Sequence, residues 1–184
     1  MKSVAGLGLG VIALTAGAFI SAGEAAGHGT TLSSLARGSY FEAAVKGATA
    51  ARPSGDVAFG IVGDSAAGVA AFTITLGAED SSGAILFTNL DGGIPAPGRY
   101  ELDGENGFRA TYVAGSPERP AGLFRAERGT LEMTESSTGH ISGHFSFTGT
   151  GFLASDPADE DRHVTVNGAF TSTHDVPAPR PAQP

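Results

Sequence analysis

The stretch HISGHFSFT, residues 140–148, decides the fold of this chain, because hydrophobic and polar side chains alternate along it. Ile141, Phe145 and Phe147 fall on one face of an extended strand, and histidine, serine and threonine side chains fall on the other. A period of two residues is typical of a half-buried β-strand with one face on a core and the other in water.

The same alternation continues on both sides of this stretch, between clusters of Gly, Pro, Asp and Asn that favour turns. About nine such strands follow one another, with a hairpin turn expected at Asp103–Gly107. We therefore predict an all-β domain over residues 39–175, an antiparallel β-sandwich or barrel. Its expected core consists of Phe72, Ile74, Leu76, Phe87, Tyr100, Phe145, Phe147, Val164, Val166 and Phe170.

The composition agrees with a small β-domain and excludes several classes of protein. Among 184 residues, 28 are glycine and 10 are proline, which is too many for a helical bundle. Hydrophobic residues make up 41% and charged residues 16%, enough apolar material for a core. The net charge of −8 disfavours nucleic-acid binding. The absence of cysteine excludes disulfides, thiolate metal sites and a lipidated N-terminal cysteine.

The N-terminus carries an apolar segment that has two interpretations. Lys2 precedes Val4–Gly23, a run without charge, and Glu24 follows it. Residues 1–25 fit a secretory signal peptide that is cleaved, and they also fit one retained transmembrane helix. In the second case Lys2 stays in the cytoplasm. Both interpretations place the β-domain outside the bacterial cytoplasm, joined to the segment by a linker at residues 26–38.

Small residues recur at helical spacing within the apolar run. Such positions let a lipid-embedded helix approach its neighbours closely. If the helix is retained, we expect it to pack against other membrane helices through Gly6, Gly10, Ala13 and Gly17.

The C-terminus, residues 176–184, has a proline at every second or third position. Such a segment neither joins a sheet nor forms a helix, so we expect an extended tail. Either the tail is a free end, or it lies on a partner protein through Pro177, Pro179, Arg180 and Pro181.

Three stretches, residues 129–134, 139–148 and 164–170, carry a recurring pattern of glycines, threonine and alternating hydrophobic residues. In them the chain resembles the closing strands of small exported bacterial β-domains of unknown function. The resemblance covers about 45 residues of this sequence. It implies a β-fold and an exported location, and it implies no activity. Many of those domains are lipoproteins, whereas this chain has no cysteine to carry a lipid.

Three histidines are candidates for a metal site. His140 and His144 share a strand face, and His163 joins that face if the two strands pair as a hairpin. However, His140 and His144 are four residues apart, which is about 13 Å along a strand. We therefore expect solvated histidines, with a metal site only if a bulge at Gly143 brings them together.

Other motifs favour turns and surface over chemistry. Gly63-Asp64-Ser65 resembles the nucleophile block of Gly-Asp-Ser hydrolases, but that family needs helices that this sequence does not predict. The acidic loop Asp156–Asp161 lacks the spacing of a known calcium loop, so whether it binds calcium stays open. The arginines near residues 119–128 indicate an exposed strand edge, whose alternating charge deters edge pairing.

We therefore expect a module with no catalytic residues and no cofactor. One hypothesis is an accessory structural subunit of a larger inner-membrane complex, such as photosynthetic or respiratory assemblies by analogy. In it the β-domain lies in the periplasm, and the partners are integral membrane subunits. The alternative is a binding module whose signal is cleaved, soluble in the periplasm or secreted.

Overall fold

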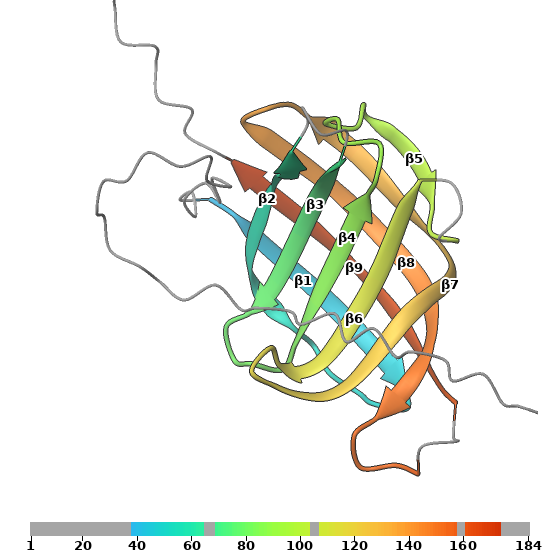
Figure 1. Cartoon of the computed structure of the whole chain (residues 1–184). Coiled ribbons are helices and arrows are strands. Elements are labelled where there is room, and N and C mark those ends of the chain that lie inside the picture. Colours follow the sequence, from blue (N-terminus) through green and yellow to red (C-terminus); the bar gives the residue numbers. More distant parts are fainter. Residues whose placement is uncertain (1–37, 65–68, 104–106, 158–160, 174–184) are drawn as a thin grey trace, which may run out of the picture.

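The computed structural model describes residues 38–64, 69–103, 107–157 and 161–173, and these residues form an all-β domain (Figure 1). In the described part of the chain no helix is long and apolar enough to cross a membrane. The predicted helix at residues 1–25 and the tail at 176–184 lie outside the described residues. The strands are β1 (Tyr40–Gly47), β2 (Ser54–Asp64), β3 (Val69–Ala78), β4 (Gly83–Asn89), β5 (Gly98–Glu101), β6 (Phe108–Ser116), β7 (Arg119–Ser136), β8 (His140–Leu153) and β9 (Arg162–Thr173).

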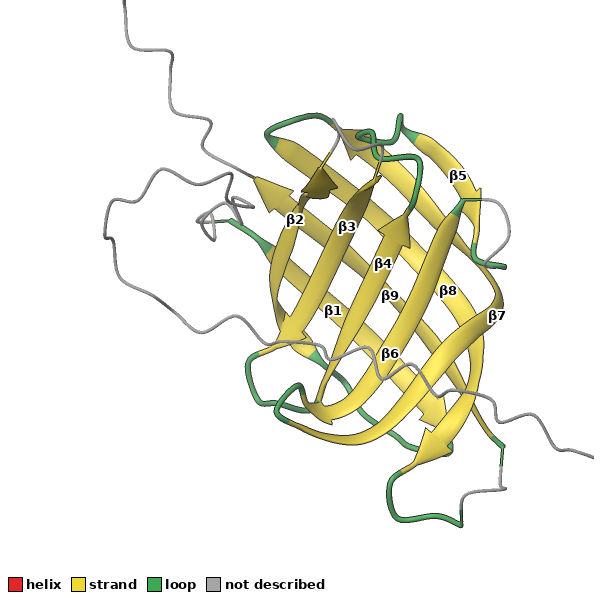
Figure 2. Ribbon diagram, viewed as in Figure 1, coloured by secondary structure: helices red, strands yellow, loops and turns green. Residues whose placement is uncertain are grey.

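Eight of the strands close into an antiparallel barrel, and β5 is an additional strand beside it (Figure 2). The hydrogen-bonded order is β7-β6-β4-β3-β2-β1-β9-β8, and β8 pairs again with β7. The last strand returns to the first, with register from Tyr40↔Thr171 to Gly47↔Val164. This pairing decides between the two expected architectures in favour of the barrel, because a closed ring of strands leaves no second sheet.

The strand β5 departs from the expected hairpin. It pairs with β7, from Gly98↔Met133 to Glu101↔Thr130, and β6 pairs with β4 instead. The reason is the length of β7, which has 18 residues and pairs with β6 only as far as Arg125. The second half of β7 therefore offers a free edge on that side, and β5 occupies it.

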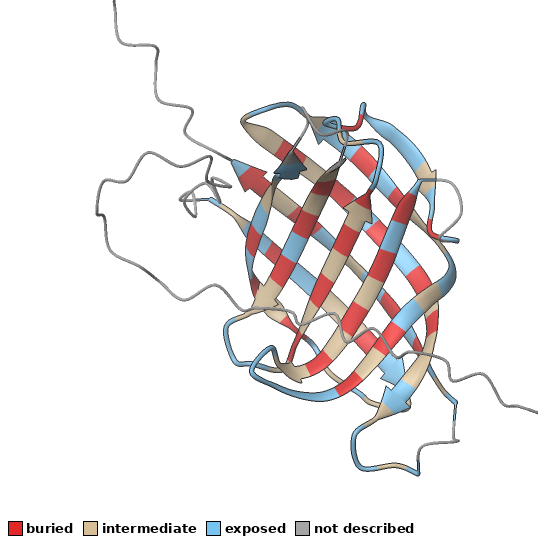
Figure 3. Cartoon of the chain, viewed as in Figure 1, coloured by how far each residue is buried: buried red, intermediate tan, exposed pale blue. Residues whose placement is uncertain are grey.

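The core lies inside the barrel, and buried residues alternate with more exposed ones along most of the eight strands of the ring (Figure 3). Nine of the ten predicted core residues are buried, with at most 4% of their surface exposed. The tenth, Tyr100, is only half-buried, because it lies on β5 outside the ring of eight strands. Its ring packs against Phe108 at 5.3 Å between centroids, and its hydroxyl donates to the Ala96 carbonyl at 2.6 Å.

Aromatic rings fill the barrel interior. Phe87 packs edge-on against Phe145, with 5.1 Å between ring centroids. The ring of Phe145 lies over Gly168, where an added Cβ would come within 2.7 Å of the ring. The interior of an eight-stranded barrel is just wide enough for side chains to fill it. Glycine at this position therefore makes room for a phenylalanine of the neighbouring strand.

The barrel has two ends, which we call proximal and distal. At the proximal end β1 begins and β9 ends, so the described chain starts and finishes there (Figure 1). The same end holds the segment between β4 and β6 and the turn between β7 and β8. The distal end holds the turns β1–β2, β3–β4, β6–β7 and β8–β9.

Candidate functional site

The three histidines all lie on the outer face of the β7–β8–β9 sheet, each next to a polar neighbour. His140 contacts Glu135, with 2.5 Å between Nε2 and Oε2, and its Nδ1 lies 3.0 Å from the Thr173 hydroxyl. His144 Nε2 lies 3.4 Å from a carboxylate oxygen of Glu132. These pairs are local cross-strand contacts between partly or largely exposed side chains, typical of a solvated sheet face.

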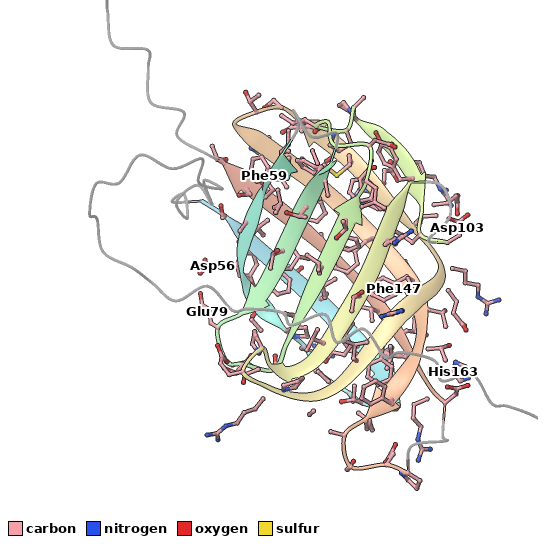
Figure 4. The ribbon with its side chains drawn as sticks, viewed as in Figure 1. Asp56, Phe59, Glu79, Asp103, Phe147 and His163 are labelled. Atoms are coloured by element: carbon pink, nitrogen blue, oxygen red, sulfur yellow. The ribbon has the colours of Figure 1, made fainter. Side chains whose placement is uncertain are left out.

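The expected hairpin of β8 and β9 forms, but it does not bring the histidines together. His163 pairs with Thr150, and the His163 ring Nδ1 lies 2.9 Å from the Thr150 hydroxyl. Thr150 is six residues from His144 along β8, which corresponds to about 20 Å. His163 therefore projects from the outside of the barrel, away from Phe147 in the core (Figure 4). Among the residues described, no three His, Asp or Glu side chains are grouped to hold a metal ion.

The acidic loop contributes an ion pair at the distal end. Arg162 Nε donates to Asp156 Oδ2 at 2.8 Å, and the Asp156 side chain is only 16% exposed. This contact joins the two ends of the β8–β9 connection. Residues 158–160 lie outside the described part of the chain, and so does Ser65 of the Gly-Asp-Ser motif.

Of the arginines of β7, only Arg125 is paired on both sides, so the sequence-based expectation of an exposed strand edge is corrected at that residue. Arg125 pairs with Thr111 of β6 on one side and with Thr150 of β8 on the other. Among the pairings of the described strands, Arg119 has a partner in β6 alone and Arg128 a partner in β8 alone. The alternation of charge along β7 reflects its outer face, because successive side chains of a strand point to opposite faces.

A groove of about 600 Å³ lies along β1 where β1 meets β2 and β9. Exposed Glu42 and Arg52 lie on its walls, with Asn167 of β9 opposite. Part of Phe145 lines its floor. The groove therefore combines both signs of charge with an amide and an aromatic surface.

The proximal end carries most of the exposed large hydrophobic side chains, a feature that the sequence analysis missed. Five of the six on the described residues belong to it: Tyr40, Ile61, Val62, Leu90 and Ile94. A signal was present, because Leu90 and Ile94 interrupt a turn cluster of Asn, Asp and Gly. Residues of a turn usually face water, so large apolar side chains there mark a surface with another role.

Comparison with known proteins gives no relative. No family model matches the chain, and neither a curated protein nor a solved structure matches it. What the chain does is therefore inferred from its own residues.

Proposed function

We propose that this chain is a non-catalytic β-barrel domain of the bacterial periplasm, anchored in the inner membrane by its N-terminal segment. It serves as an accessory structural subunit of a larger membrane complex. The observation that carries the proposal is the apolar proximal end, which lies where the chain enters the barrel at Gly38. The uncharged run Val4–Gly23 precedes that point in the sequence and is long enough for one membrane span.

The filled interior supports a role for the outer surface of the barrel. Barrels that carry a small ligand keep an internal space for it, whereas here aromatic rings such as Phe87 and Phe147 pack against each other inside. The separated histidines support a non-catalytic role, since acid–base or metal chemistry needs such groups within contact of one substrate.

The proposed partners are integral membrane subunits. The small-residue face of the N-terminal segment, Gly6, Gly10, Ala13 and Gly17, is suited to close packing against their helices. The proline-rich tail at 176–184 leaves from the proximal end, after Thr173, and so starts on the side of the barrel where the anchor joins. The described chain begins at Gly38 and ends at Thr173, so the two outer segments attach on the same side of the barrel.

Intact mass spectrometry of the protein extracted from native membranes tests the proposal. We expect a full-length mass and integral subunits that co-purify. Gly6→Leu with Gly10→Leu should reduce co-purification while the barrel stays folded. Gly8→Leu is the matched control, because residue 8 lies off that helix face. Recovery only in the soluble fraction, or a mass lacking residues 1–25, would contradict the proposal.

The groove beside β1 favours a second candidate, a secreted or periplasmic binding module released by signal cleavage. Glu42, Arg52 and Asn167 are the groups that would fix the orientation of a small polar ligand there. The same mass measurement separates the two candidates. A soluble protein without residues 1–25 would support the binding module.

A further inference from the structure

The exposed hydrophobic side chains of the proximal end are large and strongly exposed. Leu90 exposes 58% of its surface, Tyr40 50% and Ile61 45%. Val62 exposes 37% and Ile94 36%. The sixth such residue of the described chain, Phe152, lies near the opposite end and exposes 52%. The apolar side chains are thus concentrated at one end of the barrel.

Four of these side chains, Ile61, Val62, Leu90 and Ile94, come from two neighbouring segments, and we call them the proximal patch. The segment after β4 folds back over the start of β3, since an added Cβ at Gly92 would lie 3.1 Å from the Ala70 side chain. Ala70 pairs with Gly63, the residue after Val62. The segment is shaped at its start by the Asn89 side chain, which accepts a hydrogen bond from the Asp91 N–H at 2.8 Å.

The exposure of Ile61 results from the way the barrel ends. Val57, Phe59 and Ile61 share the inner face of β2, but their exposure increases from buried to half-buried to exposed. The register of β1 with β2 reaches only Gly55, because β1 begins at Tyr40. Beyond Gly55 the inner face of β2 becomes more exposed residue by residue, and at Ile61 it joins the proximal patch.

We infer that the proximal patch rests on the lipid bilayer, with Leu90 and Ile94 in the boundary between headgroups and acyl chains. The inference rests on the proposed function, because the anchor at Val4–Gly23 joins the barrel at this end through residues 24–37. These residues attach at the proximal end and reach at most about 50 Å when extended, so this end lies nearer to the anchor's attachment than the distal end does. Tyr40 at the same end fits the preference of tyrosine for the membrane–water interface.

The charges indicate that apolar contact, and not attraction to anionic lipid, holds the patch on the membrane. The chain has a net charge of −8, and Asp91 lies between Leu90 and Gly92 within the patch segment. An anionic bilayer would repel such a surface. We therefore expect contact with neutral phosphatidylcholine bilayers and little effect of salt.

The chain has no tryptophan, so a single introduced tryptophan reports on its own position. The full chain carrying Leu90→Trp is reconstituted in phosphatidylcholine vesicles, some of which contain a lipid with a quencher near the headgroup. We expect blue-shifted emission and strong quenching for Leu90→Trp. Phe152→Trp is the matched control, since Phe152 is similarly exposed but lies toward the distal end. We expect no quenching for this variant.

Further variants and a flotation assay make the outcome decisive. Adding Ile61→Ser and Ile94→Ser to Leu90→Trp should reduce the quenching while the chain still floats with the vesicles. Equal quenching of Leu90→Trp and Phe152→Trp, or none of either in chains that float, would overturn the inference alone. Blue-shifted emission of Leu90→Trp in native membranes, with no quenching in the vesicles, would place a protein on the patch and also overturn it. A chain that does not float overturns the proposed function, and the inference with it.

Discussion

The two ends of the barrel are formed by the same eight strands, but they differ in which kinds of side chain they expose to solvent. At the distal end charged residues are frequent, including Glu79 and Asp80 between β3 and β4, and Asp156 pairs with Arg162. Glu79 projects into solvent beside Asp56 (Figure 4). The proximal end has a contact of its own, between His140 and Glu135, but it also exposes Leu90 and Ile94.

This difference indicates which end makes contacts outside the chain. An end whose charged side chains pair within the chain is stable in contact with water. An end with large exposed hydrophobic side chains is more stable when another surface covers it. The two ends should therefore differ in how much their exposed and their paired residues contribute to folding.

The largest expected effect on the free energy of unfolding comes from replacing a buried hydrophobic residue in the proximal half of the barrel. Replacing an exposed one there should have little effect. Phe72 is fully buried, with ring centroids 6.3 Å from Phe59 and 6.4 Å from Phe108. Phe72→Ala should lower the free energy of unfolding by about 3–5 kcal/mol, because it leaves a cavity. Leu90→Ser should change it by less than about 0.5 kcal/mol, because Leu90 is exposed. Equilibrium urea unfolding of the full chain measures both, and a large loss for Leu90→Ser would give the proximal patch a folding role.

A smaller effect is expected for the ion pair of the distal end. Asp156→Asn should lower the free energy of unfolding by about 1 kcal/mol, since the Asp156–Arg162 contact is short and only partly exposed. The loss should shrink at high salt, because salt screens the wild-type pair. Glu101→Gln is the control, since Arg99 and Glu101 are 4.0 Å apart and both mostly exposed. Equal losses for the two variants in urea unfolding would remove this contrast between the ends.

The smallest effect at neutral pH is expected for Tyr112, whose ring lies in the distal half of the core. Burial raises the pKa of the Tyr112 phenol above its ordinary value. The folded barrel therefore holds the proton more tightly than the unfolded chain does. The stability that results is present below the ordinary phenol pKa and is lost as the pH rises through the raised pKa.

Thermal unfolding across the alkaline range measures this loss. Tyr112→Phe should make the melting temperature less dependent on alkaline pH, at a cost near neutrality of about 0.5 kcal/mol for the long hydrogen bond to the Ser82 carbonyl. Tyr40→Phe, at a half-exposed position of the proximal end, should keep the wild-type alkaline profile. An unchanged profile for Tyr112→Phe would show that another group governs alkaline unfolding.

The alternation of residues along single strands was sufficient to predict the fold class and most of the core. Phe145, Phe147 and Val166 are buried as expected, because a strand that faces a core on one side repeats every two residues whatever its partners are. The same local pattern identified His140, His144 and His163 as outward-facing. It also separated His140 from His144 by about 13 Å. The distance of His163 from both depends on the register of β8 with β9, which the pattern does not give.

Register, closure and the unequal ends are properties of strand pairing, which the sequence alone left undetermined. Alternation is the same in a sandwich and in a barrel, so only the pairing of β1 with β9 decided between them. The length of β7 relative to β6 moved β5 out of the expected hairpin. The exposure of Ile61 follows from where β1 begins against β2, because an inner-face side chain is buried only where the wall around it continues.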